Sequence, residues 1–514
     1  MTTTDNNATL LESVPVVALG ASAGGLDALK AFFGAIMPDT NAAYVVITHR
    51  GADDVTLLPE ILAKYTTMPV TEAKDNTRLK AGHVYTSPAA HYLRLFDGAV
   101  MFSEQPKSHV NLPIDFFFRS LAEQRREKGV CVILSGNGSD GTLGLQTVKA
   151  EGGYALVQDV RTAKFGDMPA SAIGTGLADE VLRPEEMAAA IRDYLATVQS
   201  KQGRPRSLVD QEDALNEILV LVRRRTGSDF GLYKTNTLIR RIERRMNVHH
   251  LTDAWDYVRY LQHNDQEIAF LYKEFLIGVT AFFRDEEAFA ALEKEALPEL
   301  LKNKQNGGTV RIWVSGCSTG EEAYSIAMLI QEYMEKNGRQ FSVQIFATDL
   351  DETAINTGRL AVYSDGIGLD VSEARLERHF IREDSHYRIR KHLREMVIFA
   401  TQNLVQDPPF TKLDLVSCRN LLIYLDGQTQ KRLMPLFHSA LRPGGMLFLG
   451  SSETIGTFNN IFDAVHARAR IFQRKEVAMP TTRLARLSDY SRLATIEPRP
   501  EEPDSKPPEK APSI

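Results

Sequence analysis

The sequence predicts an α/β protein that has two doubly wound α/β domains with a small all-α module between them. Short apolar runs alternate with segments of helical spacing over residues 14–197 and again over 291–475. This alternation is typical of parallel sheets with helices on both faces. Residues 208–290 show helical spacing without a good strand, so they form the expected all-α module. A chain of 514 residues has room for about three such domains.

The first domain, 14–197, is predicted from apolar strands separated by helical patterns. The 13 residues before it are expected to be disordered. Residues 198–207, VQSKQGRPRS, are polar and broken by Gly203 and Pro205, which predicts a linker. The predicted strands lie at 14–20, 43–48, 130–134 and 153–158, and the predicted helices at Leu26–Ile36, Thr56–Tyr65 and Ile114–Lys128.

The all-α module and the second α/β domain are predicted from the same periodicities. Residues 476–514 form a Pro-rich tail, and the last 18 residues contain six prolines and many charges. Such a segment cannot bury a core and is expected to be disordered. The predicted helices of the module lie at Ala214–Arg225, Thr235–Val248, Asp253–His263 and Asp265–Ile277, and the predicted strands of the second domain at 310–315, 343–348, 396–401, 414–418 and 446–450.

Composition and charge argue against several classes of protein. There are 60 Lys and Arg residues and 66 Asp and Glu residues, and the net charge of −6 argues against a dedicated nucleic-acid binder. The three cysteines are too few for a disulfide framework or a zinc site, so we expect a reducing compartment and no metal. No run approaches the about 20 apolar residues of a membrane-spanning helix, and the N-terminus does not resemble a signal peptide. A cytoplasmic protein without membrane insertion is the expectation.

Three predicted strands of the first domain lead into residues typical of hydrolases. Ser22 follows the first strand in VVALGASAGGL, His49 follows the second in VVITHRG, and Asp140 lies after the third in VILSGNGSDGT. Parallel strands end at one edge of a sheet, and a serine with a base and an orienting carboxylate is a nucleophilic site. Each residue also has a structural alternative: a strand–turn–helix junction or phosphate loop, a structural histidine and a turn aspartate.

Longer segments around these residues identify a family. They are GASAGGLDAL, VVITHRGADDVTLLPEIL, LPIDFFFRSLAE, VILSGNGSDGTLGL and KFGDMPASAI. Together they make residues 14–195 similar to the catalytic domain of the chemotaxis protein-glutamate methylesterases, the CheB type. The resemblance implies a Ser-hydrolase domain in which Ser22, His49 and Asp140 are the catalytic triad. It also implies hydrolysis of γ-glutamyl methyl esters on chemoreceptors and deamidation of certain glutamines.

A strongly basic segment lies in the all-α module. Arg240, Arg241, Arg244 and Arg245 fall largely on one face of a predicted helix. One alternative is a solvated helix face, and another is a docking surface for an acidic partner. Nucleic acid is disfavoured because no aromatic residues interleave with the patch. Partner binding is the functional prediction for these four residues.

The second α/β domain begins with features of nucleotide binding. The strand VRIWVS leads into GCSTG and a helix, as in adenosine-binding domains, although the loop is not GxGxxG. The next strand ends in Asp349, where an acidic residue commonly binds ribose hydroxyls. The alternative for Asp349 is the N-cap of a helix at Glu352–Thr357.

Further segments make residues 208–475 similar to the chemotaxis receptor glutamate methyltransferases, the CheR type. They are TNTLIRRIERRM, GVTAFFRDEEAF, VSGCSTGEEAYSIAM, FATDLDETAI, FATQNL, DLVSCRNLLIYL and LRPGGMLFLGSSE. The resemblance implies a Rossmann-like domain that methylates receptor glutamates with S-adenosylmethionine, and a departure at Gly278, where the family often has asparagine. The residues implied to bind the cofactor are Thr280, Arg284, Glu322, Asp349, Asn403, Leu404, Arg419 and Asn420.

Tyr424, in NLLIY, is the candidate for positioning the substrate carboxylate, and its alternative is core packing. Glutamate is already ionised at neutral pH, so methyl transfer requires orientation more than a base. The whole sequence predicts a bifunctional chemotaxis-type enzyme that methylates receptor glutamates and hydrolyses the esters, with a methyl-accepting chemoreceptor or similar signalling protein as partner. The alternatives are a signalling scaffold with only one active enzyme, and a nucleic-acid methyltransferase, for which DPPF at 407–410 is the nearest motif.

Overall fold

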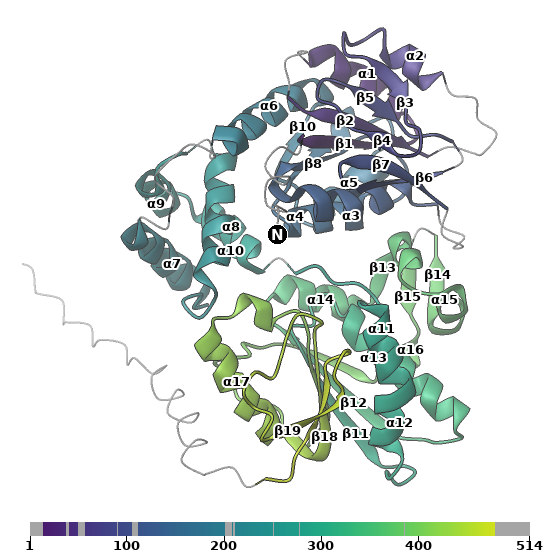
Figure 1. The fold of residues 1–514 in the computed structure, drawn as a ribbon, viewed down its shortest axis with the longest axis vertical. Helices are drawn as coiled ribbons and strands as arrows, with labels where there is room; N and C mark the ends of the chain where they lie inside the picture. The colour runs from purple at the N-terminus through teal and green to yellow at the C-terminus, as the bar shows by residue number, and fades with distance from the viewer. Residues whose placement is uncertain are drawn as a thin grey trace, which may run out of the picture.

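The computed structural model describes residues 14–36, 41–49, 57–89, 91–104, 111–200, 208, 211–249, 251–276, 278–384 and 386–477. The expectations for residues 1–13, 201–207 and 478–514 lie outside these residues. Figure 1 shows an N-terminal α/β domain in purple and blue, a helical module in teal, and a C-terminal α/β domain in green and yellow. This arrangement confirms the predicted fold class.

The N-terminal sheet forms because its central strands are apolar on both faces. Every residue of β1 (Val16–Ala21) and of β8 (Gly129–Ile133) is buried. β1 pairs in parallel with β8 on one side and with β2 (Ala43–Thr48) on the other, so the strand order reverses at β1. Among the described residues the order is β10-β9-β8-β1-β2-β5-β3, in which the outer strands are β10 (Glu180–Leu182), β9 (Tyr154–Gln158), β5 (Val84–Thr86) and β3 (Val70–Glu72).

Helices cover both faces of this sheet, because successive residues of β1 point to opposite sides. Val16 shares a core with Phe117 of α3 (Pro113–Arg125), and Val17 shares another with Phe32 of α1 (Gly25–Ala35). The other helices are α2 (Leu58–Leu62), α4 (Thr142–Ala150), α5 (Asp167–Gly174) and α6 (Pro184–Ser200). α6 therefore includes residues 198–200, which the sequence assigned to a linker.

A small antiparallel sheet in this domain was not predicted. Its strands are β4 (Thr77–Arg78), β7 (Ala99–Ser103) and β6 (Tyr92–Phe96), in the order β4-β7-β6. Leu93 and Leu95 of β6 join the core under α3, while Arg94 is exposed. Alternation over so few residues gives only a weak sequence signal.

The helical module contains α7 (Glu212–Thr226), α8 (Thr235–Val248), α9 (Ala254–Gln262) and α10 (Asp265–Leu276), close to the predicted helices. Its own core includes Ile218, Ile242 and Tyr257. The module ends earlier than the predicted boundary at 290, because Phe282 and Phe289 already pack in the core of the C-terminal domain.

The C-terminal sheet is parallel through its first five strands and ends in an antiparallel hairpin. Its order in the described chain is β16-β12-β11-β17-β18-β20-β19. These strands are β16 (Val397–Thr401), β12 (Ser342–Asp349), β11 (Thr309–Ser315), β17 (Leu413–Cys418), β18 (Leu441–Leu449), β20 (Ile471–Arg474) and β19 (Phe462–His466).

Helices and a second small sheet complete the C-terminal domain. The small sheet was not predicted, and its strands are β13 (Val362–Ser364), β15 (His386–Ile389) and β14 (Phe380–Glu383). The helices are α11 (Glu286–Ala291), α12 (Leu297–Leu301), α13 (Glu321–Lys336), α14 (Glu352–Leu360), α15 (Glu373–His379), α16 (Lys391–Arg394) and α17 (Gly427–Ala440). Within the described residues, no helix has both the length and the apolar character to cross a membrane.

The predicted docking face on α8 is occupied by the protein's own N-terminal domain. Arg240 is exposed, but Arg241, Arg244 and Arg245 are buried. The guanidinium of Arg244 contacts Asp179 of the N-terminal domain and donates to the backbone oxygen of Gly153 at 3.0 Å. The prediction of a free surface formed by all four arginines is therefore wrong for three of them.

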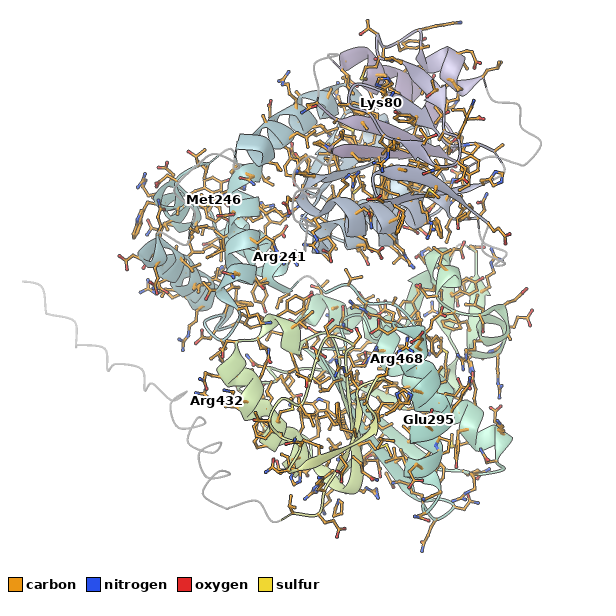
Figure 2. All side chains as sticks on the ribbon, viewed as in Figure 1. Lys80, Arg241, Met246, Glu295, Arg432 and Arg468 are labelled. Carbon is orange, nitrogen blue, oxygen red and sulfur yellow. The ribbon has the colours of Figure 1, made fainter. Side chains whose placement is uncertain are left out.

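Arg241 has a partner across the same interface, and Arg245 has one within the helical module. Arg241, labelled in Figure 2, donates to the backbone oxygen of Lys149 at 3.2 Å. Arg245 forms two hydrogen bonds with Glu267 of α10, at 2.9 and 2.6 Å. Spacing alone identified a basic helix face, but it could not show that acidic residues of the same chain cover that face.

Candidate active sites

Ser22, His49 and Asp140 lie at the carboxyl edge of the N-terminal sheet. Ser22 follows β1, His49 follows β2, and Asp140 lies between β8 and α4. Nε2 of His49 is 3.1 Å from Oδ2 of Asp140 and 2.9 Å from the backbone oxygen of Asn111. The fold thus brings the expected base against the carboxylate that would orient it.

The start of α3 fixes Asp140 in place. Its two carboxylate oxygens accept hydrogen bonds from the backbone N–H groups of Ile114, at 3.0 Å, and Asp115, at 2.8 Å. Both groups belong to the first turn of α3, where N–H groups lack partners within the helix and favour negative charge. Only 2% of the Asp140 side chain is exposed, so water screens its interaction with His49 very little.

The surroundings of His49 leave one ring nitrogen as a base. Both neighbours of Nε2 are hydrogen-bond acceptors, so we infer that the neutral ring carries its proton there. Nδ1 is buried and has no hydrogen-bond partner among the described residues. Burial lowers the pKa of His49, but the hydrogen bond and charge of Asp140, together with the Asn111 backbone and the charge of Asp115, raise the pKa above its ordinary value of 6.5. Nδ1 is therefore the nitrogen available as a base, and in this structure it forms no hydrogen bond with the described hydroxyl of Ser22.

Two glycines allow the tight packing around Ser22. Gly24 has a φ of +69°, a left-handed conformation that favours glycine, just before α1 begins. A Cβ on Gly136 would lie 2.8 Å from Cβ of Ser22 and 2.1 Å from Sδ of Met168. The loop after β8 and the first turn of α5 consequently lie directly beside the predicted nucleophile.

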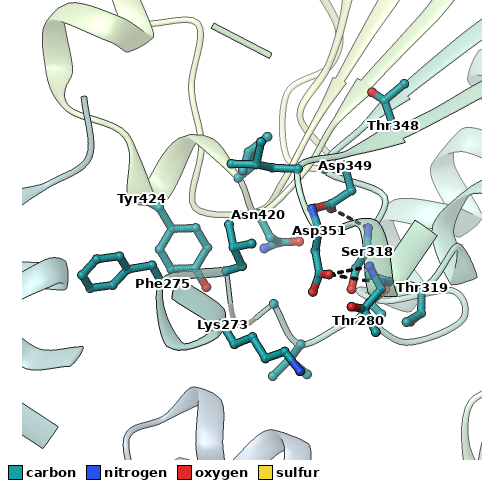
Figure 3. Close-up of a pocket in the computed structure, with 18 of the residues that line it drawn as sticks. Lys273, Phe275, Thr280, Ser318, Thr319, Thr348, Asp349, Asp351, Asn420 and Tyr424 are labelled. Carbon is teal, nitrogen blue, oxygen red and sulfur yellow. Dashed lines mark hydrogen bonds between the residues drawn. The ribbon is translucent and has the colours of Figure 1, made fainter. Parts of the chain in front are cut away.

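A cavity of about 400 Å³ lies beside the C-terminal sheet, and Figure 3 shows part of its lining. It is next to the carboxyl ends of β11 and β12, and the strand order reverses at β11, the kind of position where α/β domains bind ligands. Its volume is in the range of small-molecule sites. The cavity is lined by all the residues that the sequence predicts for this site: Thr280, Arg284, Glu322, Asp349, Asn403, Leu404, Arg419, Asn420 and Tyr424.

Asp349 does not cap the helix that follows it. Its Oδ2 accepts a hydrogen bond from the N–H of Ser318 at 2.8 Å, and its Oδ1 accepts one from Asp351 at 3.0 Å. The N-cap of α14 is Asp351, which accepts from the N–H groups of Thr353 and Ala354. The capping alternative for Asp349 is therefore wrong. Burial raises the pKa of Asp349 despite these backbone hydrogen bonds.

Arg419 and Glu322 hold each other at the edge of the cavity. The Arg419 guanidinium lies 3.2 Å from Oε2 of Glu322, whose Oε1 accepts a hydrogen bond from Ser417 at 2.7 Å. Arg419 is also 5.0 Å from the ring centre of Phe289 and 4.5 Å from that of Phe448. These contacts position both charged groups and leave little freedom in this part of the lining.

The lining fits S-adenosylmethionine. Asp349 lines the cavity, and an ionised carboxylate has about four acceptor sites, so acceptor capacity remains for ribose hydroxyls beside the hydrogen bonds from Ser318 and Asp351. The loop between β11 and α13 has left-handed backbone at Gly316 and Gly320, and it lies against the end of β12 through the hydrogen bond of Gly316 to Thr348. At Gly278, a Cβ would meet nothing closer than 3.9 Å, so the cavity is open where the family often has asparagine.

The sequence did not predict several residues of the cavity. Lys273 and Phe275 come from α10, and Figure 3 shows Lys273, Phe275 and Tyr424 across the cavity from Asp349. The N-terminal domain also contributes to the lining. Its five residues, which we call the N-terminal wall, are Gln146, Ser171, Gly174, Thr175 and Leu177. No periodicity or motif could have placed them beside a cavity of another domain.

The folds and sites define a protein that joins a serine-esterase domain to a nucleotide-binding methyltransferase domain. The family described as CheB methylesterase matches residues 17–191. The all-alpha domain of CheR methyltransferase matches residues 213–276, and its SAM binding domain matches 278–471. The chain belongs to the chemotaxis protein methyltransferases and also carries a CheB methylesterase domain. The cofactor of its methyltransferase domain is S-adenosylmethionine.

Several individual proteins are similar to parts of this chain. A chemotaxis protein methyltransferase of Borreliella burgdorferi is 31% identical over 49% of this chain and 91% of its own length. An uncharacterised 104.1 kDa protein of Rhodobacter capsulatus is 38% identical over 81% of this chain, which spans only 46% of that protein. The CheB methylesterase catalytic domain of Thermotoga maritima is 30% identical over 35% of this chain and 99% of its own, with a TM-score of 0.34.

Proposed function

We propose that this protein methylates glutamate side chains of chemotaxis receptors and also hydrolyses the resulting γ-methyl esters. One observation carries the proposal that both reactions serve one substrate. Helix α5 begins beside Ser22, where Met168 packs against Gly136, and its last residue, Gly174, lines the methyltransferase cavity. A short rigid element therefore joins the two sites.

In the esterase reaction, the Oγ of Ser22 attacks the ester carbonyl carbon while Nδ1 of His49 takes its proton. That proton then passes to the departing methoxide, which leaves as methanol. A water molecule, deprotonated by the same nitrogen, hydrolyses the glutamyl–serine ester and restores Ser22. Asp140 keeps the ring in one orientation and stabilises its protonated form.

In the methylation reaction, bound S-adenosylmethionine supplies a methyl group attached to a positively charged sulfur. The acceptor carboxylate is already ionised at neutral pH, so the protein does not have to remove a proton. Asp349 and the loop at Gly316 hold the nucleoside side of the cavity, and Tyr424 positions the carboxylate from the opposite side. Catalysis then depends mainly on proximity and orientation.

The proposed partner is a methyl-accepting chemoreceptor or a similar signalling protein, and the proposed location is the cytoplasm. Membership of the two chemotaxis families supports the partner. Cys131, Cys317 and Cys418 are buried thiols without disulfides, which suits a reducing compartment. No observation favours a scaffold with one inactive enzyme.

The direct test is incubation with methyl-labelled S-adenosylmethionine and membranes from the native cell. We expect labelled receptor and labelled methanol to appear together. Ser22→Ala should raise the steady level of receptor methylation, and Asp349→Ala should lower it. If Ser22→Ala left the methylation of every substrate unchanged, the two domains would act on different targets.

A further inference from the structure

The cavity of the methyltransferase is closed on one side by the methylesterase domain. Gln146 comes from α4, Ser171 and Gly174 come from α5, and Thr175 and Leu177 follow α5. These residues face the same cavity as Asp349 and Tyr424 of the C-terminal domain. A substrate bound at Tyr424 therefore shares one cavity with the N-terminal wall.

A cluster of buried charges holds this wall in place directly behind the cavity. Nζ of Lys149 is 2.7 Å from Asp179 and 2.8 Å from Glu274, and Arg244 contacts both acids. At most 5% of each of these four side chains is exposed. On α4, Lys149 of this cluster lies one helical turn after Gln146 of the N-terminal wall. Buried pairs of this kind resist separation, because removing either partner leaves an uncompensated charge.

A second contact joins the methylesterase domain to the methyltransferase domain. Arg119 of α3 forms two hydrogen bonds with the carboxylate of Asp370, at 2.7 and 3.1 Å. Leu143 of α4 also packs against Gly366, where a Cβ would lie only 2.4 Å from its Cδ1. The methylesterase domain is thus held by two separate sets of contacts, one to the helical module and one to the methyltransferase domain.

The cavity also has one cation available for an anionic substrate. Arg419 is paired with Glu322 and Asp285, and Arg284 donates to the backbone oxygen of Val279. Among the described lining residues, Lys273 is the cation with neither a hydrogen bond nor an ion pair. The side chain of Lys273 is exposed to solvent. Gly174 of the N-terminal wall is also exposed. A carboxylate that enters here meets an unpaired positive charge.

Resting on the proposed function, we propose that the methyl-acceptor site is composite. Lys273 of the helical module and the N-terminal wall, a part of the methylesterase domain, together bind the acidic peptide segment that carries the substrate glutamate. Lys273 attracts the carboxylate. The hydroxyl of Ser171 accepts a hydrogen bond from Thr142 and keeps its own proton to donate to the segment around it.

The wall can be tested at Gly174, because a Cβ there meets nothing within 4 Å and its φ is not left-handed. Gly174→Glu places a negative charge at the wall without a clash, and Gly174→Lys places a positive one. Gly34 of α1 is a matched control: it is also an exposed helical glycine with open space around it, but it does not line the cavity.

The full-length protein is assayed with labelled S-adenosylmethionine while the amount of native membranes is varied. Gly174→Glu should raise the KM for the membranes on the order of tenfold through repulsion of the acceptor, Gly174→Lys should lower it through attraction, and Gly34→Glu should match the wild type. Calorimetry should give one dissociation constant for S-adenosylmethionine in all four proteins. If the wild type methylates the membranes and the four proteins share one KM, the composite site is overturned.

Lys273 is tested in the same assay. Lys273→Gln should raise the KM for the membranes and weaken its dependence on salt, whereas Lys273→Arg should restore both. A loss of S-adenosylmethionine binding in Lys273→Gln would assign the residue to the cofactor and contradict the proposal. A wild type that methylates no protein in the membranes would instead overturn the proposed function, and with it this inference.

Discussion

The two active sites of this protein are built in opposite ways. The esterase site depends on a few side chains that react with the substrate. Two backbone N–H groups of α3 bind the carboxylate of Asp140, and Asp140 in turn orients His49. The methyltransferase site is a cavity of about 400 Å³ with many lining residues and no base that the reaction needs. The esterase site acts through side chains that react with the substrate. The methyltransferase site acts by holding the cofactor and the acceptor carboxylate in position.

This difference predicts how each site responds to substitution. Removing one reacting group from the esterase site stops a covalent pathway, so the loss is large. Removing one contact from the methyltransferase cavity weakens binding or orientation, so the loss is graded. Four substitutions, from the largest expected effect to the smallest, test this contrast.

Ser22→Ala should have the largest effect. It removes the nucleophile, and losses of about 10⁶-fold in kcat follow such changes in serine hydrolases. Methanol release from a pre-methylated receptor measures it. Binding of S-adenosylmethionine should stay unchanged, which serves as the internal control. Methanol release at the wild-type rate would contradict the assignment of Ser22.

Asp140→Asn should cost about 10⁴-fold in kcat/KM, because the ring of His49 loses its orientation and the charge that stabilises its protonated form. It should also change the pH profile. The wild-type rate should rise with pH through a pKa above 6.5, since the neutral ring is the base. Without the carboxylate, burial dominates and the pKa falls, so the rising limb should move to lower pH. If the rising limb of the Asp140→Asn profile stayed at the wild-type pH, Asp140 would not be the group that sets the pKa of His49.

Asp349→Ala should weaken binding of S-adenosylmethionine by about 1–3 kcal/mol, the scale of a charge-assisted hydrogen bond. Calorimetry measures the change. Glu352→Ala is the control, because it removes a nearby exposed carboxylate that does not line the cavity. Helix α14 should remain as stable as before, since Asp351 caps it. Equal affinity in the two variants would exclude Asp349 from the cofactor site.

Tyr424→Phe should have the smallest effect, a fall in kcat of less than about tenfold with the affinity for S-adenosylmethionine unchanged. The ring and its packing are kept, so only the hydroxyl is tested. Single-turnover methylation of native membranes is the measurement. An unaltered rate would support the core-packing alternative for this residue.

The sequence predicted most of the fold and many of the residues at both sites, because those features are local. Val16–Ala21 is a continuous apolar run, and such a run predicts a buried parallel strand wherever it occurs. Residues that follow such strands are placed at a sheet edge by the topology alone, which is why Ser22, His49 and Asp349 could be named in advance.

The contacts between domains could not be predicted in this way. The spacing of Arg241, Arg244 and Arg245 shows a basic helix face, but not that Asp179 lies against it. The N-terminal wall has no sequence signal, since Ser171 and Thr175 acquire their place only through the docking of two domains. Short strands such as β4 and β13 were missed because two or three residues do not establish a period.

The buried charges at the interface also restrict how the halves of this protein can be exchanged. Asp179 and Lys149 belong to the methylesterase half, and Arg244 and Glu274 belong to the methyltransferase half. A chimera that received the methylesterase of another protein would bury Arg244 and Glu274 against the residues that its new domain has in place of Asp179 and Lys149. The chimera should fold as one unit only if the new domain supplies an acidic residue and a basic residue at these two positions. A substitution at one of these positions during evolution would be tolerated best when its counterpart changed too, so the two halves are constrained to evolve as a pair.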